Sequence, residues 1–133
     1  MKISTKIVKI KTHGPNKLFD ITDPLKSFSK NIGQGIVNIF SKGSTGALVL
    51  LPRKKEIIEQ FEEDLWDLVE IYGWRHPGNA YAHLRSTLIG TNLVLLVEEG
   101  ELLIPEDHSV FFVENQPYIM RERTIIFTGI LMS

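Results

Sequence analysis

Three observations predict an α+β domain in which antiparallel sheets have helices packed against them. Strand-like and helix-like segments follow one another closely, their connections are mostly of hairpin length, and no repeat or linker divides the sequence. The 133 residues are close to the commonest size of a single domain, and the hydrophobic content of 43% is enough for one core. We therefore expect residues 1–133 to form one domain.

The strands are predicted from short apolar or alternating runs that turn residues bound on either side. In Lys2–Thr12, isoleucines are interspersed with lysines and threonine, as is typical of a half-buried strand. Residues 13–16 (HGPN) have the backbone preferences of a turn. The predicted strands cover residues 2–12, 18–21, 35–40, 47–51, 92–97, 102–104, 109–114 and 123–131.

Three segments predict helices. Thr22 or Asp23 is the expected N-cap of the first helix. Residues 54–69 repeat apolar side chains at helical spacing and carry acidic residues on the other side. A third helix is expected to follow Asn79, its N-cap, and to stop at Gly90.

The composition narrows the function classes. A formal net charge of −1 gives no basic excess that would indicate nucleic acid binding. The chain has no cysteine, which excludes disulfides, thiolate metal sites and cysteine nucleophiles. The apolar runs are too short to cross a bilayer, and the N-terminus lacks an apolar run of signal-peptide length. We expect a soluble cytoplasmic protein that has no membrane or nucleic acid partner.

The stretch RHPGNAYAHLRST, residues 75–87, holds the main candidates for a functional site. Asn79, His83 and Thr87 are spaced four apart and share one face of the predicted helix. A helix N-terminus attracts anions, so the His83 imidazole could bind a phosphate oxygen, a metal or a water. Leu84 and Leu88 share another face and are expected to point into the core.

These residues also have purely structural interpretations. A histidine in the first turn of a helix is commonly an ordinary polar residue, and a loop histidine beside proline, such as His76, is common too. Arg85 is expected to face solvent or to pair with an acidic neighbour, and Tyr81 to contribute to packing. Spacing alone leaves the structural and the functional interpretation open.

The segment GNAYAHLRSTLIG at residues 78–90 resembles the signature of the YjbQ-like family, in which G-N-A-D-A-H is followed by a run that ends in L-[L/I]-G. Other stretches match that family in the same order: FDITD at 19–23, GIVNIFSKGSTGAL at 35–48, EEGELLI at 98–104 and RERTIIFTGI at 121–130. The resemblance runs almost from end to end of the chain.

The resemblance implies a sandwich of two antiparallel β-sheets with two to three helices packed against them. It also implies a homotrimer with sites near the subunit boundaries. Members of the family are associated with an accessory thiamine-phosphate synthase activity, which joins a pyrimidine pyrophosphate to a thiazole phosphate. Some members carry a bound metal or anion near a histidine cluster.

Transferred position by position, the resemblance implies a set of site residues in this chain. The matching residues are His83, Asn79, Ser44, Thr45, Arg85 and Thr87. The chain departs from the family pattern at several places. The usual Asn-Glu pair is Leu51-Pro52, and the acidic residues beyond it are RKK at residues 53–55. The motif aspartate is Tyr81, the first motif histidine is Gly43, and the G-T-W-Q stretch is PEDH at residues 105–108. These changes indicate a reshaped pocket or a member that has lost the family chemistry.

The first functional hypothesis is the transferase reaction. Its site must stabilise the departing pyrophosphate. The backbone and hydroxyl groups of Gly43, Ser44 and Thr45 could form an anion site. Arg85 could supply positive charge, and His83 could donate a hydrogen bond or hold a Mg²⁺-bound water.

Two further hypotheses stand beside it. His76, His83 and His108 could form a three-nitrogen shell for Zn²⁺ and support hydrolysis, although their spacing is no standard ligand signature. His108 could equally be a surface residue at the start of a strand. Alternatively, the chain is a non-catalytic trimer that binds a small phosphorylated ligand or a protein partner.

Overall fold

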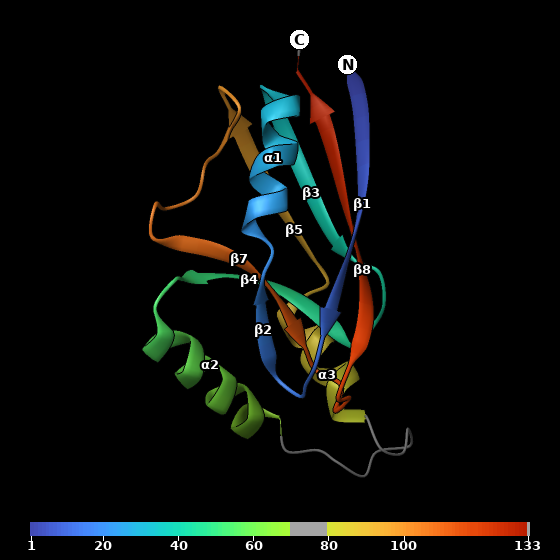
Figure 1. Ribbon diagram of the computed structural model, residues 1–133, viewed down its shortest axis with the longest axis vertical. Helices are drawn as coiled ribbons and strands as arrows, with labels where there is room; N and C mark the ends of the chain where they lie inside the picture. The colour runs from blue at the N-terminus through green and yellow to red at the C-terminus, as the bar shows by residue number, and fades with distance from the viewer. Residues whose placement is uncertain (70–79, 133) are drawn as a thin grey trace.

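The computed structural model describes residues 1–69 and 80–132, which form an α+β fold (Figure 1). Eight strands and three helices are present within these residues, as the sequence predicted. In chain order they are β1 (Lys2–Thr12), β2 (Lys17–Asp20), α1 (Thr22–Ile32), β3 (Gly35–Ser41), β4 (Gly46–Pro52), α2 (Lys55–Leu68), α3 (Ala80–Ile89), β5 (Asn92–Glu98), β6 (Glu101–Leu102), β7 (His108–Glu114) and β8 (Arg121–Leu131).

The strands form two antiparallel sheets, which confirms the predicted fold class. One sheet has five strands in the order β1-β8-β3-β5-β6, and the other has three in the order β2-β7-β4. β8 lies between β1 and β3, and it pairs with β1 from Lys2↔Leu131 to Thr12↔Arg121. The chain ends marked N and C therefore lie close together in Figure 1.

The main hydrophobic core lies between the two sheets and α1. Ile125 and Phe127 of β8 face Phe112 of β7, and all three side chains are buried. Phe28 of α1 packs on Phe127 with 5.7 Å between the ring centroids, so α1 covers the inner face of the five-stranded sheet. Burial of side chains of this kind contributes about 1.5–3 kcal/mol each to folding.

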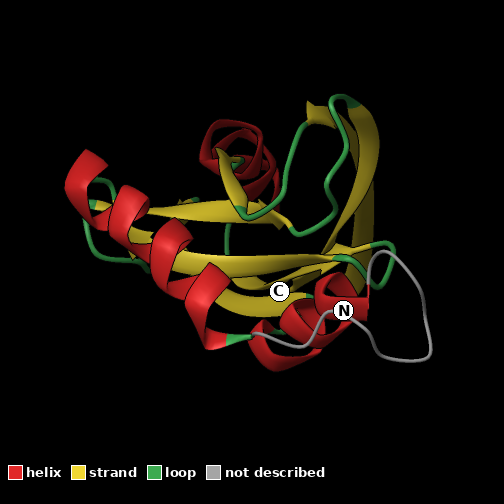
Figure 2. Cartoon of the chain, turned by 90° about the horizontal axis from the view of Figure 1, so that it is seen from below, coloured by secondary structure: helices red, strands yellow, loops and turns green. Residues whose placement is uncertain are grey.

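Helices α2 and α3 cover the other face of the three-stranded sheet (Figure 2). Leu65 of α2 is buried with Ala47 of β4 and Val113 of β7. Phe61 of α2 and Ile89 of α3 pack against this second cluster. Helix α3 lies beside β4.

Of the two leucines predicted to point into the core, Leu84 is partly buried against the cluster of Val69, Tyr81 and Ala82. The prediction was wrong for Leu88, which is 68% exposed. The buried residues of α3 are instead Ala80, Tyr81, Ala82, Arg85 and Ser86. Two of these five, Arg85 and Ser86, are polar, so the apolar pattern of the sequence did not reveal which face packs.

The start of α1 also differs from the prediction. Its N-cap is Ile21, which makes no side-chain capping bond. The Asp20 carboxylate accepts a hydrogen bond from the Thr22 N–H at 2.9 Å. The Thr22 hydroxyl is buried and accepts a bond from the Val110 N–H of β7 at 2.9 Å, so it links the helix to the sheet instead of capping it.

β6 is shorter than the strand predicted over residues 102–104. The backbone turns after Leu102, and the N–H of Ile104 donates to the Leu102 carbonyl at 3.0 Å. The Leu103 N–H still donates to the Leu96 carbonyl of β5 at 3.0 Å, but the strand pairing does not continue beyond it.

The outer face of the five-stranded sheet is the side opposite α1. One row of residues crosses four strands there: Ile3, Ile130, Ile36 and Leu96 are neighbours in the strand register. Ile3 is 69% exposed and Leu96 is 55% exposed. No helix within residues 1–69 and 80–132 packs on this row, which leaves an apolar surface that we call the outer sheet face.

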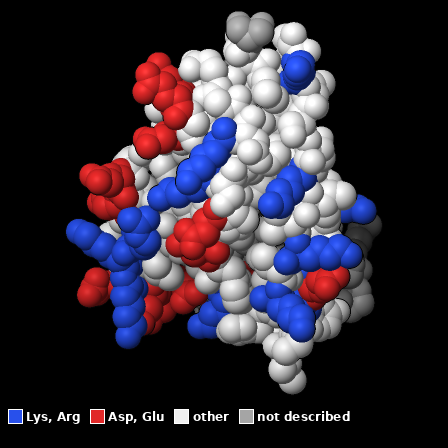
Figure 3. All heavy atoms as spheres, turned by 45° about the horizontal axis from the view of Figure 1, so that its top comes forward, with Lys and Arg blue, Asp and Glu red and all other residues white. Residues whose placement is uncertain are grey.

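Charged side chains of both signs are interspersed on the molecular face shown in Figure 3, with uncharged areas between them. This agrees with the formal net charge of −1. Among the described helices, none has the length and apolar character required to span a membrane.

Candidate functional site

The loop between β3 and β4 meets α3 at a pair of polar side chains. The hydroxyl oxygen of Ser44 lies 3.1 Å from Nδ1 of His83, which is a hydrogen-bonding distance, although the two residues are 39 positions apart in sequence. The pair is exposed to solvent. The structure therefore brings together the loop hydroxyl and the helix imidazole that the sequence analysis selected.

Packing at the start of β4 fixes the path of this loop. A Cβ atom at Gly46 would lie 2.3 Å from Cζ of Phe112, so only glycine lets β4 approach the Phe112 ring this closely. At the far end of α3, the carbonyl of Gly90 accepts a bond from the Leu48 N–H at 3.1 Å, which ties the helix to β4. Both ends of the Ser44–His83 contact are thus positioned by β4.

Thr87 lies one turn beyond His83 on α3 and is exposed. Its hydroxyl donates to the His83 carbonyl at 2.8 Å. Asn79 and His76, the other predicted site residues of this segment, lie outside the described residues.

A buried ion pair lies beneath the loop. The Arg123 guanidinium of β8 donates from Nε to the Glu114 carboxylate at 2.7 Å, and its Nη2 group bonds to the second carboxylate oxygen. The same Nη2 group donates to the Thr45 hydroxyl at 2.8 Å. Thr45, assigned to the anion site by resemblance, is buried and joins the loop to this ion pair.

Gly43 also lies close to Arg123. A Cβ atom at Gly43 would be 3.5 Å from the Nη1 atom of Arg123, and the φ angle of Gly43 is 146°. A side chain would be strained at this φ, so glycine keeps the loop backbone near the guanidinium.

The ionised form of Glu114 is stabilised by its neighbours. Burial alone raises the pKa of this carboxyl. The hydrogen bonds from Arg123 and Thr12 have a larger combined effect, so the pKa lies below its ordinary value. Thr12 donates to the carboxylate at 2.6 Å. Glu114 and Arg123 therefore stay charged and paired, and the guanidinium carries little unbalanced charge.

Arg85 lies on a different face of α3 from His83, which corrects the prediction that it is solvent-facing or paired with an acidic residue. It is fully buried, and its guanidinium donates to the carbonyls of Leu65, Trp66 and Val69 near the end of α2 at 3.0–3.2 Å. Residues two apart on a helix do not face each other. Arg85 thus anchors α3 to α2, and the structure does not place it with the Ser44–His83 pair.

Tyr81 also packs at this helix contact, as predicted. The Arg85 guanidinium carbon lies 4.7 Å from the centroid of the Tyr81 ring and 4.7 Å from that of Trp66. The position where the family motif has an aspartate thus carries a buried aromatic side chain in this chain.

His108 does not lie near His83 within the chain. In the β4–β7 ladder, Gly46 pairs with Glu114 whereas Pro52 pairs with His108. These two pairs are six residues apart, or about 20 Å along the strands. Nδ1 of His108 lies 2.7 Å from the Asp107 carboxylate, and this hydrogen bond is the main reason why the pKa of Asp107 is lowered.

The proposed zinc shell is therefore not assembled by His83 and His108 of one chain. Within residues 1–69 and 80–132, no group of three or more His, Cys, Asp or Glu side chains is placed to share a metal ion. The donors within the described residues do not fit the Mg²⁺ or Zn²⁺ site considered from the sequence, so we derive no step through a metal held by the protein.

Comparison with known proteins identifies relatives of this chain. The family model described as UPF0047 protein YjbQ-like matches residues 6–131, nearly the whole chain. The chain belongs to the YjbQ-like family. A UPF0047 protein of Archaeoglobus fulgidus is 30% identical over 109 residues, which cover 79% of this chain and 86% of the relative. UPF0047 protein YugU of Bacillus subtilis is 25% identical over 122 residues, which cover 82% and 87% of the two chains.

Solved structures show the same YjbQ-like fold. A YbjQ-like protein of unknown function from Sulfolobus solfataricus P2 is 28% identical, with a TM-score of 0.91 over 98% of this chain and 99% of that one. A hypothetical protein from Aeropyrum pernix K1 is 26% identical, with a TM-score of 0.87 over 97% and 99% of the two chains. The family membership predicted from sequence motifs is confirmed.

Sequence reasoning missed the Glu114–Arg123 pair of this YjbQ-like chain. A signal was present, because Arg123 alternates with Ile125 and Phe127 and so shares their inward face. Glu114 likewise follows an apolar run and has its side chain fully buried. An arginine and a glutamate on buried strand faces are rarely stable unless they pair.

Proposed function

We propose that the β3–β4 loop and His83 bind the phosphate group of a small molecule, and that this site carries the accessory thiamine-phosphate synthase reaction associated with the family. The observation that supports the proposal is the exposed contact of 3.1 Å between the Ser44 hydroxyl and His83 Nδ1. Two polar groups from distant segments converge there on a loop whose backbone also carries Gly43. Such convergence of donors suits an anionic oxygen.

The reaction makes modest demands on acid–base catalysis. The thiazole nitrogen attacks the methylene carbon of the pyrimidine pyrophosphate, a C–N bond forms, and the C–O bond breaks as pyrophosphate leaves with the electron pair. The nucleophile loses no proton, so the main task is to stabilise the leaving group. Ser44, an N–H of His83 and the backbone amides of the loop would donate to its oxygens.

The experiment measures thiamine phosphate formed from pyrimidine pyrophosphate, supplied as its Mg²⁺ salt, and thiazole phosphate. We expect His83→Ala and Ser44→Ala each to lower the rate by about tenfold or more, the usual scale for loss of one positioned donor. His13→Ala and Ser27→Ala remove an exposed imidazole and an exposed hydroxyl elsewhere and serve as matched controls. Unchanged rates in both site variants, or equal losses in the controls, would contradict the proposal.

The second candidate is a protein that binds a phosphorylated metabolite without converting it. The specific observation in its favour is Tyr81, which is buried against Arg85 where the family motif has a carboxylate. In this case, ³¹P NMR would detect saturable binding of thiazole phosphate that His83→Ala abolishes, and no thiamine phosphate would form. A protein partner at the site would instead be detected as a co-purifying chain that is lost with the same substitution.

A homotrimer is part of the same proposal. The outer sheet face is apolar and exposed, and surfaces of this kind mark association sites in many proteins. Ile36 of β3 lies in this face, so association through it would bring β3, which leads into the site loop, near a neighbouring subunit. A cytoplasmic location, which the cysteine-free composition supports, also belongs to the proposal.

A further inference from the structure

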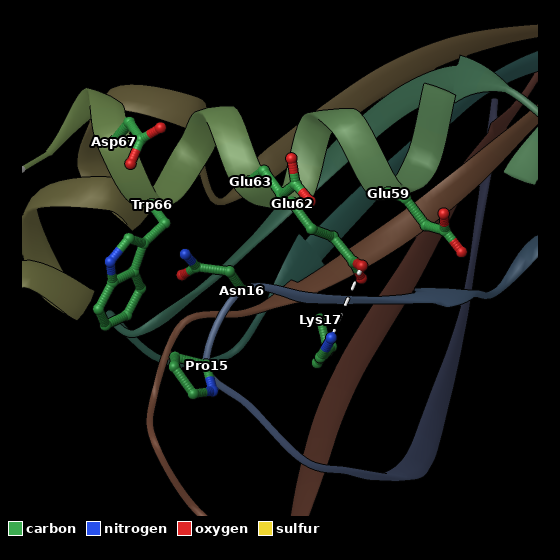
Figure 4. Close-up of a pocket in the computed structure, with 8 residues that line it drawn as sticks. All are labelled: Pro15, Asn16, Lys17, Glu59, Glu62, Glu63, Trp66 and Asp67. Carbon is green, nitrogen blue, oxygen red and sulfur yellow. Dashed lines mark ion pairs between the residues drawn. The ribbon is translucent and has the colours of Figure 1, made fainter. Parts of the chain in front are cut away.

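A groove of about 620 Å³ separates α2 from the turn that joins β1 to β2 (Figure 4). Four carboxylates line it from the α2 side, those of Glu59, Glu62, Glu63 and Asp67. Among the described residues that line it, Lys17 alone carries an ammonium group, and its Nζ lies 3.8 Å from Glu62. This excess of negative charge favours a cation and disfavours the phosphorylated ligand proposed for the loop site.

A second observation at the groove is the side chain of Asn16. Figure 4 shows it extending from the turn toward α2 and Trp66. Asn16 is only 3% exposed, and neither its amide oxygen nor its amide nitrogen has a hydrogen-bond partner within the described residues. A buried amide without a partner costs about 1–3 kcal/mol.

The backbone of Asn16 does not explain this amide. Its φ angle is 59°, which asparagine tolerates and glycine tolerates better. Glycine would supply the same turn without burying two unpaired polar atoms. The amide is therefore placed to meet a group that enters the groove.

The carboxylates differ in how far they are already engaged. Glu62 accepts the Leu18 N–H at 3.1 Å in addition to its contact with Lys17. Glu59 pairs with Lys55 at 3.8 Å. Glu63 and Asp67 are exposed and lie one helical turn apart, where like charges repel each other by a few tenths of a kcal/mol. A cation between these two carboxylates removes that repulsion.

Trp66 adds an aromatic surface beside Asp67. Its side chain is 40% exposed and lines the groove, and it already contacts the Arg85 guanidinium. An indole attracts organic cations and packs against alkyl chains. The Trp66 indole therefore favours an alkylammonium, which has both a charge and an alkyl chain, over a bare metal ion.

We propose that this groove binds a primary alkylammonium group, supplied by a free polyamine or by a lysine side chain of another protein. The ammonium lies between Glu63 and Asp67 and donates to the Asn16 amide oxygen. The amide nitrogen of Asn16 then donates to a carboxylate of the groove. The alkyl stem packs along Trp66. This site is separate from the Ser44–His83 pair and does not depend on the function proposed for it.

The test is isothermal titration calorimetry of the full chain with two probes, spermidine and N-acetyl-lysine methylamide, and with N-acetyl-norleucine methylamide as the uncharged control. We expect the ammonium probes to bind and the uncharged one not to bind. Tighter binding of spermidine identifies a free polyamine as the ligand, and tighter binding of the lysine probe identifies a protein segment.

Variants of the groove make the test specific. Asn16→Gly keeps the turn conformation and should weaken binding about tenfold, as expected for a lost hydrogen bond to a charged group. Glu63→Gln and Asp67→Asn should each weaken it several-fold. Asp64→Asn is the matched control, because Asp64 lies on α2 outside the groove and bonds to Gln60, and it should change the affinity less than twofold.

His83→Ala should leave amine binding unchanged, so failure of this proposal and failure of the proposed function can be told apart. The proposal is overturned if neither ammonium probe binds, if Asn16→Gly binds as tightly as the wild type, or if Asp64→Asn weakens binding as much as Asp67→Asn. The last result would show attraction to a generally acidic helix instead of a site.

Discussion

The carboxylate of Glu114 holds the Arg123 guanidinium, which in turn bonds to Thr45 of the β3–β4 loop. It accepts hydrogen bonds from Arg123, Thr12 and the Gln116 N–H, and its side chain is fully buried. Breaking a buried pair leaves the partner's charge without compensation, which typically costs about 3–5 kcal/mol. The interaction matters less for its net contribution to folding than for the damage that loss of either partner causes.

This pair leads to a prediction about pH. The Glu114 carboxyl has a lowered pKa when folded, whereas the unfolded chain binds the proton near its ordinary pKa of 4.5. Its stabilising effect is therefore fully present above pH 4.5 and is lost as the pH falls toward the lower, folded pKa. We expect the contribution of Glu114 to the free energy of unfolding, measured with urea between pH 3 and pH 7, to be constant above about pH 4.5 and to fall on further acidification.

Glu114→Gln supplies the comparison. At pH 7 it should lower the free energy of unfolding by about 3–5 kcal/mol, and its dependence on acid should be weaker than in the wild type. Glu98→Gln, at an exposed position on β5, should behave like the wild type. An acid dependence that is identical in all three proteins would show that Glu114 is not the responsible group.

At the scale of elements, the contact between α2 and α3 depends on one arginine. The last turn of α2 contains no basic residue of its own. Arg85 of α3 supplies the cation and donates to three carbonyls there. Carbonyls at a helix C-terminus lack partners within the helix and carry partial negative charge.

Arg85→Lys tests this interpretation because it keeps the charge but removes the planar set of donors. We expect a loss of about 3 kcal/mol in the free energy of unfolding, since several buried bonds to a charged donor disappear. Arg53→Lys is the control, because Arg53 also donates to backbone carbonyls but does so at the surface. It should cost about 1 kcal/mol or less. Equal losses in the two variants would show that burial of Arg85 adds nothing.

The sequence was sufficient to predict most elements, and the reasons for the failures are physical. β8 and α2 were predicted because one periodicity dominates each of them. In α3 the buried face includes Arg85 and Ser86, so the apolar residues did not mark it. The order of the elements also could not reveal that β3 and β4 belong to different sheets, because β3 pairs with β5 and β8 whereas β4 pairs with β7, all of them distant in sequence.

The candidate site could be predicted in part. Family motifs selected Ser44 and His83, and the structure brings these side chains within hydrogen-bonding distance. The same motifs suggested Arg85, and the departure from them at residues 105–108 suggested His108. The positions of both residues depend on long-range packing and on strand register that no local pattern encodes. The register of β4 with β7 alone separates His108 from the loop.

For the whole molecule, the outer sheet face predicts association. Leu96 is 55% exposed and lies in the apolar row that crosses four strands. If the trimer forms through this face, Leu96→Glu places a charge in the interface and dissociates it. Light scattering should change from three times the chain mass of 15.2 kDa to a single chain mass.

Leu68→Glu makes the same change at a 73% exposed position on α2, away from the outer sheet face, and should leave the trimer intact. A wild-type protein that is monomeric at all concentrations would contradict the proposed assembly. A trimer that survives Leu96→Glu would place the interface on another surface.

The central position of β8 has a consequence for the growing polypeptide. Until residues 121–131 have left the ribosome, β1 and β3 present two open edges to each other across the gap that β8 later fills. Unpaired strand edges can pair with other chains. Strands that are distant in sequence pair slowly, so the edges stay open for longer. The nascent chain should therefore be most prone to aggregate just before β8 emerges, and it is at this stage that chaperones would protect it.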